Sequence, residues 1–325
     1  MSLLKHSEDD LCVNVLLTST CNAGCSWCIA DDFMKNQHAS KKMSEGSMEI
    51  LLKKLEQEKL LQVNLLGGEP SLHPQALDFG ESVHNLGIPV GFSTNALWPN
   101  SFREKFSNIN YPLEAEITYL GKHAYSEEKL KKIIKTFEQL KGHPTSVGLI
   151  LDTPQTRFEE HLDLAEEYGF QLRWAIVEPT IKSGLTKGYQ SLENVQGISK
   201  RAIEIVKEAN KRGIKTWADL TVPKCAIPKE DLYIFEGTQN DIQFKCPPFF
   251  DISPDLKIWR CLPLAGNDLS SLLEFDSFKQ AYRHLNKVKI PYLDKGVFDE
   301  CKSCEYLTDA CSGGTSIAKI LKHGN

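Results

Sequence analysis

The segment CVNVLLTSTCNAGCSWC, residues 12–28, joins an apolar, β-branched run to three closely spaced cysteines. Residues 12–18 predict a strand, and Cys21, Cys25 and Cys28 follow it as a C-x3-C-x2-C run. A loop that follows a strand of a parallel α/β sheet lies at the edge where active sites form. The position of the three cysteines therefore indicates a metal or iron–sulfur site.

The residues that follow alternate between short β-branched runs and amphipathic stretches. Strands are predicted at residues 12–18, 63–66, 90–93, 115–119, 146–151 and 172–177, and helices at 44–58, 74–86, 127–140, 157–168 and 199–212. This alternation predicts an α/β fold in which helices cover a parallel sheet, either a barrel or an open doubly wound sheet. Prolines and cysteines become frequent after residue 214 and helical patterns become sparse. We therefore expect two domains, residues 1–213 and a loop-rich, metal-stapled region at 214–325.

Composition indicates the cellular compartment and the classes of partner that we expect. The chain has 325 residues, a net charge of −5 and 41% hydrophobic residues, which is typical of a globular protein in water. Residues 1–10 are too polar for a signal peptide, and no apolar run approaches ~18 residues, so we expect a cytoplasmic protein without a membrane partner. The 38 basic and 43 acidic residues are spread along the chain, and no nucleic-acid partner is expected. Ten cysteines in a reducing compartment favour metal or iron–sulfur ligation over disulfides.

A second motif, Gly67-Gly68-Glu69-Pro70, closes the second predicted strand. Two glycines allow the backbone to approach a ligand, and a carboxylate can hold an ammonium group. Three thiolates, unlike four, leave one iron of a [4Fe–4S] cluster open to a small molecule. Taken singly, the cysteines are also compatible with a zinc site or buried thiols, and the glycines with an ordinary turn.

Together the two motifs resemble the radical SAM superfamily. The resemblance implies a partial (β/α)6 barrel over residues 11–213, a [4Fe–4S] cluster and S-adenosylmethionine (SAM). It also implies an enzyme that cleaves SAM reductively to methionine and a 5′-deoxyadenosyl radical, which abstracts hydrogen from a substrate C–H bond. A reductant such as flavodoxin or ferredoxin is the partner that this chemistry implies.

The resemblance also assigns expected roles to individual residues. The implied cluster ligands are Cys21, Cys25 and Cys28, and the implied SAM-binding residues are Trp27, Gly67, Gly68, Glu69, Ser93 and Asn95. Trp27 is expected near the adenine, and the glycines with Glu69 near the SAM amino group. The Ser93-Thr94-Asn95 segment is also ordinary turn chemistry.

Six further cysteines lie in the last third of the chain: Cys225, Cys246, Cys261, Cys301, Cys304 and Cys311. Cys246 and Cys261 bracket a predicted β-hairpin with Pro254 and Asp255 in its turn. A zinc ribbon is one interpretation of such cysteines. The preceding motifs instead suggest a resemblance to SPASM and twitch extensions of radical SAM enzymes, which implies at least one auxiliary [4Fe–4S] cluster.

The expected auxiliary ligands are Cys246, Cys261, Cys301 and Cys304, with Cys311 a further candidate. The chain departs from the full SPASM pattern, because six residues precede Cys311 and Thr315 stands where another cysteine is expected. Six cysteines do not fully ligate two clusters, so one twitch-type cluster is expected, and two incompletely ligated clusters stay open as an alternative. Cys225 is interpreted as a ligand, a packed thiol or a hydrogen-atom donor, the last a role that cysteines play in some radical SAM epimerases.

Two substrate classes fit these cofactors. One is a ribosomally made peptide that is crosslinked, joined by a thioether or epimerised; the other is an aminocyclitol or sugar that is dehydrogenated or decarboxylated. The resemblance favours the peptide. Because the first motif begins at residue 21, we expect a separate leader-peptide-binding protein in that case. A non-catalytic Fe–S or zinc scaffold protein is the alternative of another class.

Overall fold

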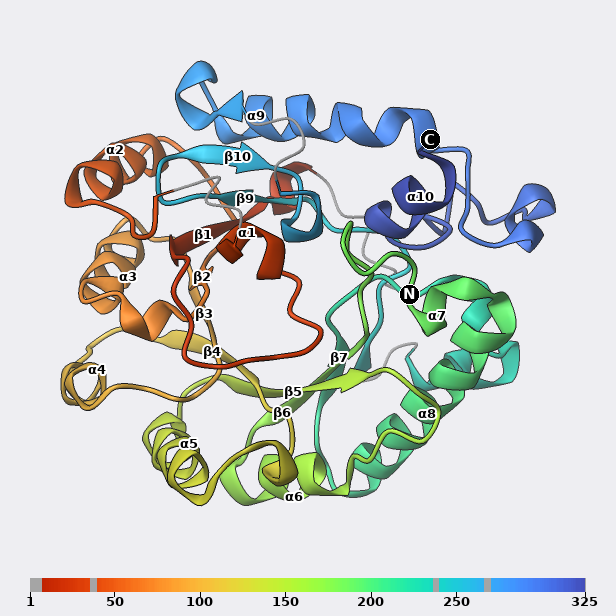
Figure 1. The fold of residues 1–325 in the computed structure, drawn as a ribbon, viewed down its shortest axis with the longest axis horizontal. Helices are drawn as coiled ribbons and strands as arrows, with labels where there is room; N and C mark the ends of the chain where they lie inside the picture. Colours follow the sequence, from red (N-terminus) through yellow and green to blue (C-terminus); the bar gives the residue numbers. More distant parts are fainter. Residues whose placement is uncertain (1–7, 36–39, 236–239, 266–269, 325) are drawn as a thin grey trace. The chain divides into compact units, whose positions relative to one another are not determined.

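The structure is a computed structural model that describes residues 8–35, 40–235, 240–265 and 270–324 (Figure 1). The chain divides into two compact units. The first unit comprises His6–Thr145 and Pro248–Lys287, and the second unit comprises Ser146–Pro247 and Val288–Asn325. The boundary predicted between residues 213 and 214 separates the domain expected to hold the first cysteine motif from the loop-rich, metal-stapled region. This boundary stays a prediction. Residues 1–7, on which much of the signal-peptide argument rests, lie outside the described residues.

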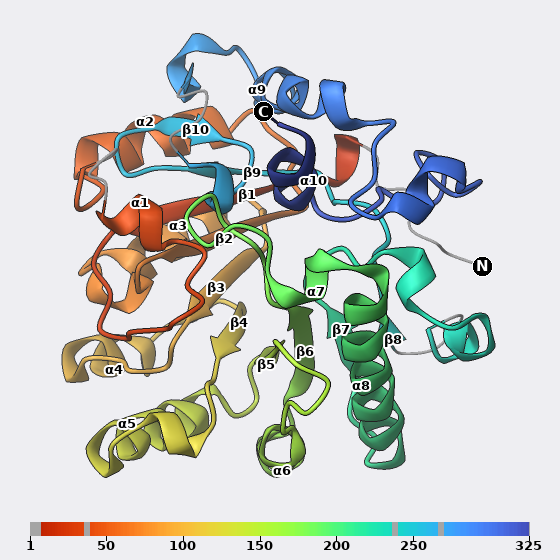
Figure 2. The ribbon, with the colours of Figure 1, turned by 45° about the vertical axis from the view of Figure 1, so that its right-hand side comes forward.

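The first unit is built on parallel strands that pair in chain order. These strands are β1 (Cys12–Thr18), β2 (Gln62–Gly67), β3 (Val90–Thr94) and β4 (Leu113–Thr118). The helices of the same stretch are α1 (Asp31–Lys35), α2 (Glu45–Leu55), α3 (Ala76–Asn85), α4 (Asn100–Phe106) and α5 (Glu127–Leu140). Figures 1 and 2 show α2, α3 and α4 running beside strands β1–β4.

On the other side of β1, the sheet continues with strands from much later in the chain. β1 pairs in parallel with β9 (Phe249–Ile252), β9 pairs antiparallel with β10 (Lys257–Trp259), and β10 pairs antiparallel with β11 (Ser270–Ser271). Helix α9 (Phe278–Leu285) follows, and its Phe278 packs against Phe250 of β9 at 5.9 Å between ring centroids. The β9–β10 pair confirms the hairpin predicted between Cys246 and Cys261.

The two faces of this sheet differ because side chains alternate along each strand. Leu65 of β2 lies beside Gly80 of α3, and Phe92 of β3 stacks on Phe102 of α4 at 5.5 Å, so one face packs on helices. The opposite face carries a row of residues in register across five strands: Asp251, Asn14, Asn64, Gly91 and Glu114. Parallel sheets are usually apolar on both faces. The polar face departs from this rule. It offers hydrogen-bonding groups at positions where a packed helix would need apolar side chains.

The second unit contains another set of parallel strands. Their order is β5 (Thr145–Leu151), β6 (Gln171–Ile176), β7 (Thr216–Ala218) and β8 (Asn240–Asp241). Its helices are α6 (Glu159–Tyr168), α7 (Lys187–Gln190), α8 (Leu192–Lys211) and α10 (Ser316–His323). The residues after α8 are rich in loops and short 3-10 turns, as the proline and cysteine content predicts.

Every predicted strand and helix is present, with differences at the ends. Helix α5 spans 127–140 as predicted, with the Ser126 hydroxyl accepting a hydrogen bond from Lys129 N–H. Helix α8 begins at Leu192, seven residues before its predicted start, because Ser191 caps it by accepting from Asn194 N–H. Helices α1, α4, α7, α9 and α10 were not predicted, since elements this short contain too few turns for a periodic pattern.

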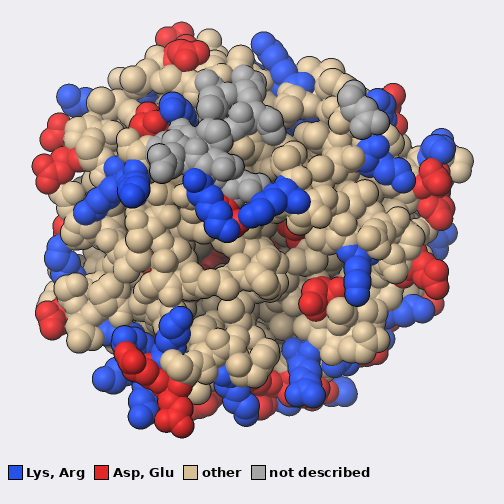
Figure 3. All heavy atoms as spheres, in the orientation of Figure 1, with Lys and Arg blue, Asp and Glu red and all other residues tan. Residues whose placement is uncertain are grey.

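No helix of the described part of the chain is long and apolar enough to cross a membrane. Figure 3 shows Lys and Arg side chains interspersed with Asp and Glu side chains on the face it presents. The α/β fold class with a mainly parallel sheet is confirmed.

Candidate active site

Cys21, Cys25 and Cys28 lie together in the loop between β1 and α1. All three are part-buried free cysteines. The N–H of Cys28 donates to the Cys25 carbonyl oxygen at 3.4 Å, and the N–H of Asp31 donates to the Cys28 carbonyl oxygen at 3.3 Å. These turns lead directly into α1. One short loop therefore presents all three thiols.

The three thiols lie close enough to affect one another's protonation. Burial, with smaller contributions from the neighbouring Cys28 and Cys21, raises the pKa of Cys25 to about 11. Among the described residues, no group of three or more His, Cys, Asp or Glu side chains is arranged around a single metal ion. A [4Fe–4S] cluster is larger than one ion and is ligated by thiolates, so three neighbouring free cysteines fit a cluster with one open iron.

Cys21 receives hydrogen bonds that suit a thiolate ligand. The N–H of Ala23 donates to Cys21 Sγ at 3.4 Å, and Asn95 Nδ2 lies 3.6 Å from the same sulfur. Asn95 Nδ2 also donates to Asn22 Oδ1 at 2.9 Å, which connects the cysteine loop with the end of β3. Hydrogen bonds to sulfur stabilise the charged form and tune an iron–sulfur cluster.

Gly67 and Gly68 bring the end of β2 against the start of the cysteine loop. Gly68 N–H donates to the Thr18 carbonyl oxygen at 2.6 Å. A Cβ on Gly67 would lie 2.3 Å from that oxygen, and one on Gly68 would lie 2.3 Å from the Thr20 carbonyl oxygen. Gly67 also has a φ of +148°, which side chains disfavour. The two glycines therefore permit a close backbone approach to the residues just before Cys21.

Glu69 is completely buried and its carboxylate holds the neighbouring loops. Oε1 accepts from Ser71 N–H at 3.2 Å and from Thr94 Oγ1 at 2.8 Å, while Oε2 accepts from Asn95 N–H at 2.7 Å. Burial raises the pKa of Glu69, and these hydrogen bonds oppose the rise. The carboxylate thus links the end of β2 to the end of β3, and its predicted contact with the SAM amino group stays a prediction.

The end of β3 is a tightly bonded turn. Ser93 Oγ donates to Glu116 Oε2 of β4 at 2.9 Å. Thr94 Oγ1 accepts from Trp98 Nε1 at 2.9 Å, and Asn95 Oδ1 accepts from Leu97 N–H at 2.8 Å. Ala96 has a φ of +62°, a strained value of the kind found at functional turns. The turn holds Asn95 in place beside Cys21, and the predicted roles of Ser93 and Asn95 toward SAM stay predictions.

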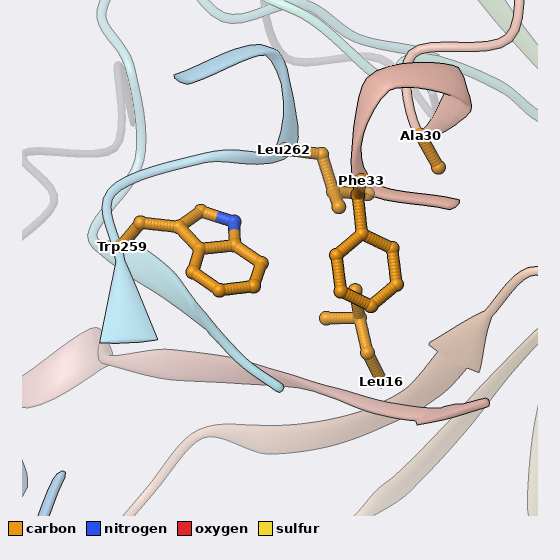
Figure 4. Packing of buried hydrophobic residues seen from close by; sticks show 5 residues of the cluster. All are labelled: Leu16, Ala30, Phe33, Trp259 and Leu262. Carbon is orange, nitrogen blue, oxygen red and sulfur yellow. The ribbon is translucent and has the colours of Figure 1, made fainter. Parts of the chain in front are cut away.

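The cysteine loop is anchored on the apolar side by a buried cluster: Leu16, Ala30, Phe33, Trp259 and Leu262 (Figure 4). Phe33 of α1 and Trp259 of β10 face each other with ring centroids 5.6 Å apart. Cys28 packs against this cluster. The anchor explains how strands from residues 249–259 support a loop at residues 21–28. Trp27 is part-buried, and its predicted place near the adenine stays a prediction.

The later cysteines are divided between the two units. Cys261 belongs to the first unit, between Trp259 and Leu262, while the remaining five belong to the second unit: Cys225, Cys246, Cys301, Cys304 and Cys311. None of these six described cysteines forms a disulfide. Their roles as auxiliary ligands, and that of Cys225 as a hydrogen donor, stay predictions.

Sequence reasoning missed the polar face of the first unit. Asn14 Nδ2 donates to Asp251 Oδ1 at 2.7 Å, and Asn64 Nδ2 donates to Asn14 Oδ1 at 3.1 Å. Gly91 continues the row because a Cβ there would lie 2.0 Å from Asn64 Oδ1. Asn14 and Asn64 each interrupt an apolar predicted strand, and that is the signal that could have revealed this face.

With this geometry in place, comparisons with known proteins define the class. The family model described as Radical SAM superfamily matches residues 15–136, which include the cysteine loop and the Gly67–Glu69 segment. Residues 15–136 of the chain therefore match a radical SAM domain. Members of this family use a [4Fe–4S] cluster and SAM, which agrees with the free cysteine triplet.

One curated relative is similar to part of the chain. Over 167 residues the chain is 26% identical to the tungsten-containing aldehyde ferredoxin oxidoreductase cofactor-modifying protein of Pyrococcus furiosus, an alignment that spans 46% of this chain and 45% of that protein. The match thus spans about half of the relative's length.

Two solved structures share the fold. SuiB of Streptococcus suis bound to S-adenosylmethionine superposes with a TM-score of 0.68 and 18% identity, over 96% of this chain and 74% of SuiB. The protein anSMEcpe with bound AdoMet superposes with a TM-score of 0.62 and 17% identity, over 94% of this chain and 88% of anSMEcpe. These likenesses agree with the predicted fold class.

Proposed function

We propose that this radical SAM enzyme holds a [4Fe–4S] cluster on Cys21, Cys25 and Cys28 and modifies a ribosomally made peptide by crosslinking, thioether formation or epimerisation. The observation that carries the cofactor assignment is the docking of Gly67 and Gly68 on the backbone just before Cys21. When bound, the cluster and SAM supply a 5′-deoxyadenosyl radical that abstracts hydrogen from a substrate C–H bond.

The chain's own residues position these groups. The turn after β3 directs Asn95 Nδ2 towards Cys21 Sγ, and Glu69 fixes that turn through its bond to Asn95 N–H. The SAM amino group is assigned to the backbone around Gly67 and Gly68, because the buried Glu69 carboxylate already accepts three hydrogen bonds. A flavodoxin or ferredoxin is proposed as the electron donor.

The polar face of the first unit is proposed to receive the substrate. Asn64 Oδ1 is a buried acceptor without a hydrogen-bond partner within the described part of the chain. Buried polar atoms are normally hydrogen-bonded, so such atoms favour a ligand that brings donors. A peptide backbone and a polyhydroxylated or amino small molecule both bring them.

A peptide substrate is supported by the likeness to SuiB, whose fold matches 96% of this chain and which has been solved bound to its precursor peptide SuiA. A separate leader-peptide-binding protein belongs to this proposal. The second candidate is a small molecule such as an aminocyclitol or sugar. A substrate other than a peptide is supported by the relative described as a cofactor-modifying protein.

The two candidates are separated by mass spectrometry of products from the reconstituted full chain with SAM and dithionite. Short peptides encoded beside the gene are tested first. Loss of a pair of hydrogen atoms indicates a crosslink or thioether, and uptake of one deuteron from D2O indicates epimerisation. Unchanged peptides, together with turnover of an aminocyclitol or sugar, would establish the second candidate instead.

A further inference from the structure

Arg103, on the short helix α4, is a buried cation that forms no ion pair with an acidic side chain of the described residues. Arg103 is only 8% exposed. Its guanidinium donates to neutral groups of α5: Nη1 to Gln139 Oε1 at 3.0 Å, and Nη2 to the Lys132 carbonyl oxygen at 2.6 Å. A buried charge without a counter-charge costs free energy. Packing of α4 on α5 therefore does not by itself account for a charged residue here.

The guanidinium also contacts a buried hydroxyl, that of Thr136 on α5. Arg103 Nη2 donates to Thr136 Oγ1 at 2.7 Å, and Thr136 Oγ1 donates to the Ala96 carbonyl oxygen at 2.7 Å. The Lys132 carbonyl oxygen also lies within reach of this hydroxyl, at 3.2 Å. Because that oxygen already accepts from Arg103, the shorter bond to Ala96 is favoured. The hydroxyl hydrogen of Thr136 thus points to the turn after β3.

The peptide group between Ala96 and Leu97 connects this hydroxyl with Asn95. The carbonyl oxygen of the peptide accepts from Thr136, and its N–H donates to Asn95 Oδ1 at 2.8 Å. At the far end of the same amide, Asn95 Nδ2 donates to Cys21 Sγ at 3.6 Å. Ala96, Leu97 and Asn95 are all buried. Hydrogen bonds in such a chain polarise one another, most of all in a low-dielectric interior.

The bonds around the Asn95 amide fix its orientation. One hydrogen of Asn95 Nδ2 is directed at Asn22 Oδ1, at 2.9 Å, which leaves the other for Cys21. Asn22 Nδ2 in turn donates to the Leu97 carbonyl oxygen at 2.8 Å. A reversed amide would place its NH2 group against the Leu97 N–H, donor against donor. The orientation that presents an N–H to the sulfur therefore depends on the position of the Ala96–Leu97 peptide.

We propose that Arg103 is a positioning residue for the SAM-cleaving cluster, acting on Asn95 through Thr136 and the turn after β3. Ala96 has a φ of +62°, so the turn needs surrounding contacts to keep its shape. The bond from Thr136 is one of these contacts, and the Arg103 charge strengthens it. Hydrogen bonds to the sulfurs of an iron–sulfur cluster help to set its reduction potential, and they favour the more negative, reduced state.

The inference rests on the proposed function where it concerns the cluster on Cys21. It also makes a claim that needs no cluster: the buried charge of Arg103 holds the Leu97 N–H against Asn95 Oδ1. The two parts are measured separately, so that failure of the cluster assignment and failure of the positioning role can be told apart.

The first measurement is the reduction potential of the cluster in the full chain, reconstituted anaerobically and titrated with EPR detection. The SAM-binding cluster is identified by the change that SAM causes in its EPR spectrum. We expect Arg103→Met and Thr136→Val to lower the ratio of reduced to oxidised cluster at a fixed potential by roughly threefold or more. Thr136→Ser keeps the hydroxyl and should keep the ratio of the unaltered chain.

Thr145→Val is the matched control for the loss of a buried hydroxyl. Thr145 Oγ1 donates to the His143 carbonyl oxygen at 3.1 Å and not to the turn after β3. The potential should therefore stay unchanged in this variant. Circular dichroism checks that every variant folds.

The second measurement is hydrogen exchange in the full chain without iron, followed by mass spectrometry of peptides that contain the Leu97 amide. We expect exchange roughly threefold faster or more in Arg103→Met and Thr136→Val. Exchange in Thr136→Ser and Thr145→Val should match that of the unaltered chain.

An unchanged potential in Arg103→Met and Thr136→Val, with full iron in both, would overturn the role of Arg103 toward the cluster. Equal behaviour of Thr136→Ser and Thr136→Val would overturn the part played by the hydroxyl. If the iron of the reconstituted chain does not depend on Cys21, the proposed function fails, and hydrogen exchange alone decides the positioning role. Faster exchange then supports that role, and unchanged exchange overturns it.

Discussion

The Glu69 carboxylate accepts a 2.7 Å hydrogen bond from the backbone N–H of Asn95, and the Asn95 side chain in turn lies 3.6 Å from Cys21 Sγ. Three separate loops, at the ends of β1, β2 and β3, are therefore joined by one short chain of contacts. The geometry of the cysteine loop depends on residues about 45 and 70 positions away. Substitutions in the loops after β2 and β3 should therefore change the geometry of the cysteine loop after β1.

Glu69→Gln tests this connection. An amide in place of the carboxylate turns one acceptor into a donor that faces the backbone N–H of Asn95 or Ser71. We expect the free energy of unfolding to fall by about 1–3 kcal/mol and SAM to bind at least tenfold more weakly. Isothermal titration with SAM and urea unfolding measure the two effects. The exposed Glu49→Gln serves as the control, and equal behaviour of the two variants would contradict the role of Glu69.

Gly68→Ala tests the docking of β2 on the cysteine loop. Its Cβ would lie 2.3 Å from the Thr20 carbonyl oxygen, so the loop must shift. Gly24→Ala is the matched control in the loop itself, because a Cβ there meets no atom within 4 Å. After reconstitution we expect Gly68→Ala to lose about four irons per chain and Gly24→Ala to keep them. Full iron and normal SAM binding in Gly68→Ala would show that the approach of the two backbones is dispensable.

Asp251 gives the first unit a pH-dependent stability. Its pKa is raised from 3.8 to about 7, because burial outweighs the opposing hydrogen bonds from Asn14 and Trp259 and the charge of Arg260. Because the folded-state pKa is the higher one, the favourable contribution is fully present below about pH 4 and is lost as the pH rises through 7. The total change is on the order of 4 kcal/mol.

Asp251→Asn removes this titration. The quantity to compare is the free energy of unfolding of the unaltered chain minus that of the Asp251→Asn variant. We expect this difference to fall between pH 4 and 7 and to level off above pH 8. Anaerobic urea unfolding at several pH values measures it, with the exposed Asp276→Asn as control. A difference that is flat with pH would mean that Asp251 is ionised throughout.

Lys319→Met tests the predicted auxiliary cluster, because the buried Lys319 ammonium interacts with Cys246, Cys311 and Cys301. Removal of a buried positive charge disfavours the more negative, reduced state, so the midpoint potential should become more negative. The apo protein should lose little stability, because burial penalises the ammonium. Redox titration followed by EPR measures the potential, with Lys322→Met on the exposed face of α10 as control. An unchanged potential would place the cluster away from Lys319.

The local patterns of the chain predicted the α/β fold well, for identifiable reasons. Strand β1 and helix α5 match their predicted ranges because each combines a clean hydrophobic period with a clear end. The cysteine spacing and the Gly67–Glu69 segment were visible because they are local. The pairing of β1 with β9 was not predicted, since 237 positions separate Asn14 from its partner Asp251. The hydrogen bond from Lys224 N–H to Cys311 Sγ, across 87 positions, is a contact of the same long-range kind.

The same difference between local patterns and long-range contacts applies to the roles of individual residues. Cys21 could be singled out from its neighbours in sequence, whereas its bond from Asn95 required the fold. Glu69 was expected near the SAM amino group because a carboxylate can hold an ammonium group, and that role stays a prediction. Its three hydrogen bonds from Ser71, Thr94 and Asn95 could not be predicted, because local composition does not encode them.

The most direct test of the central claim is the formation of 5′-deoxyadenosine from SAM. The reconstituted chain is incubated anaerobically with SAM and dithionite, beside the variant in which Cys21, Cys25 and Cys28 are replaced by Ala. We predict 5′-deoxyadenosine and methionine in equal amounts from the unaltered chain and none above background from the variant. No 5′-deoxyadenosine from an unaltered chain that carries its full iron, or equal yields from both proteins, would contradict the account.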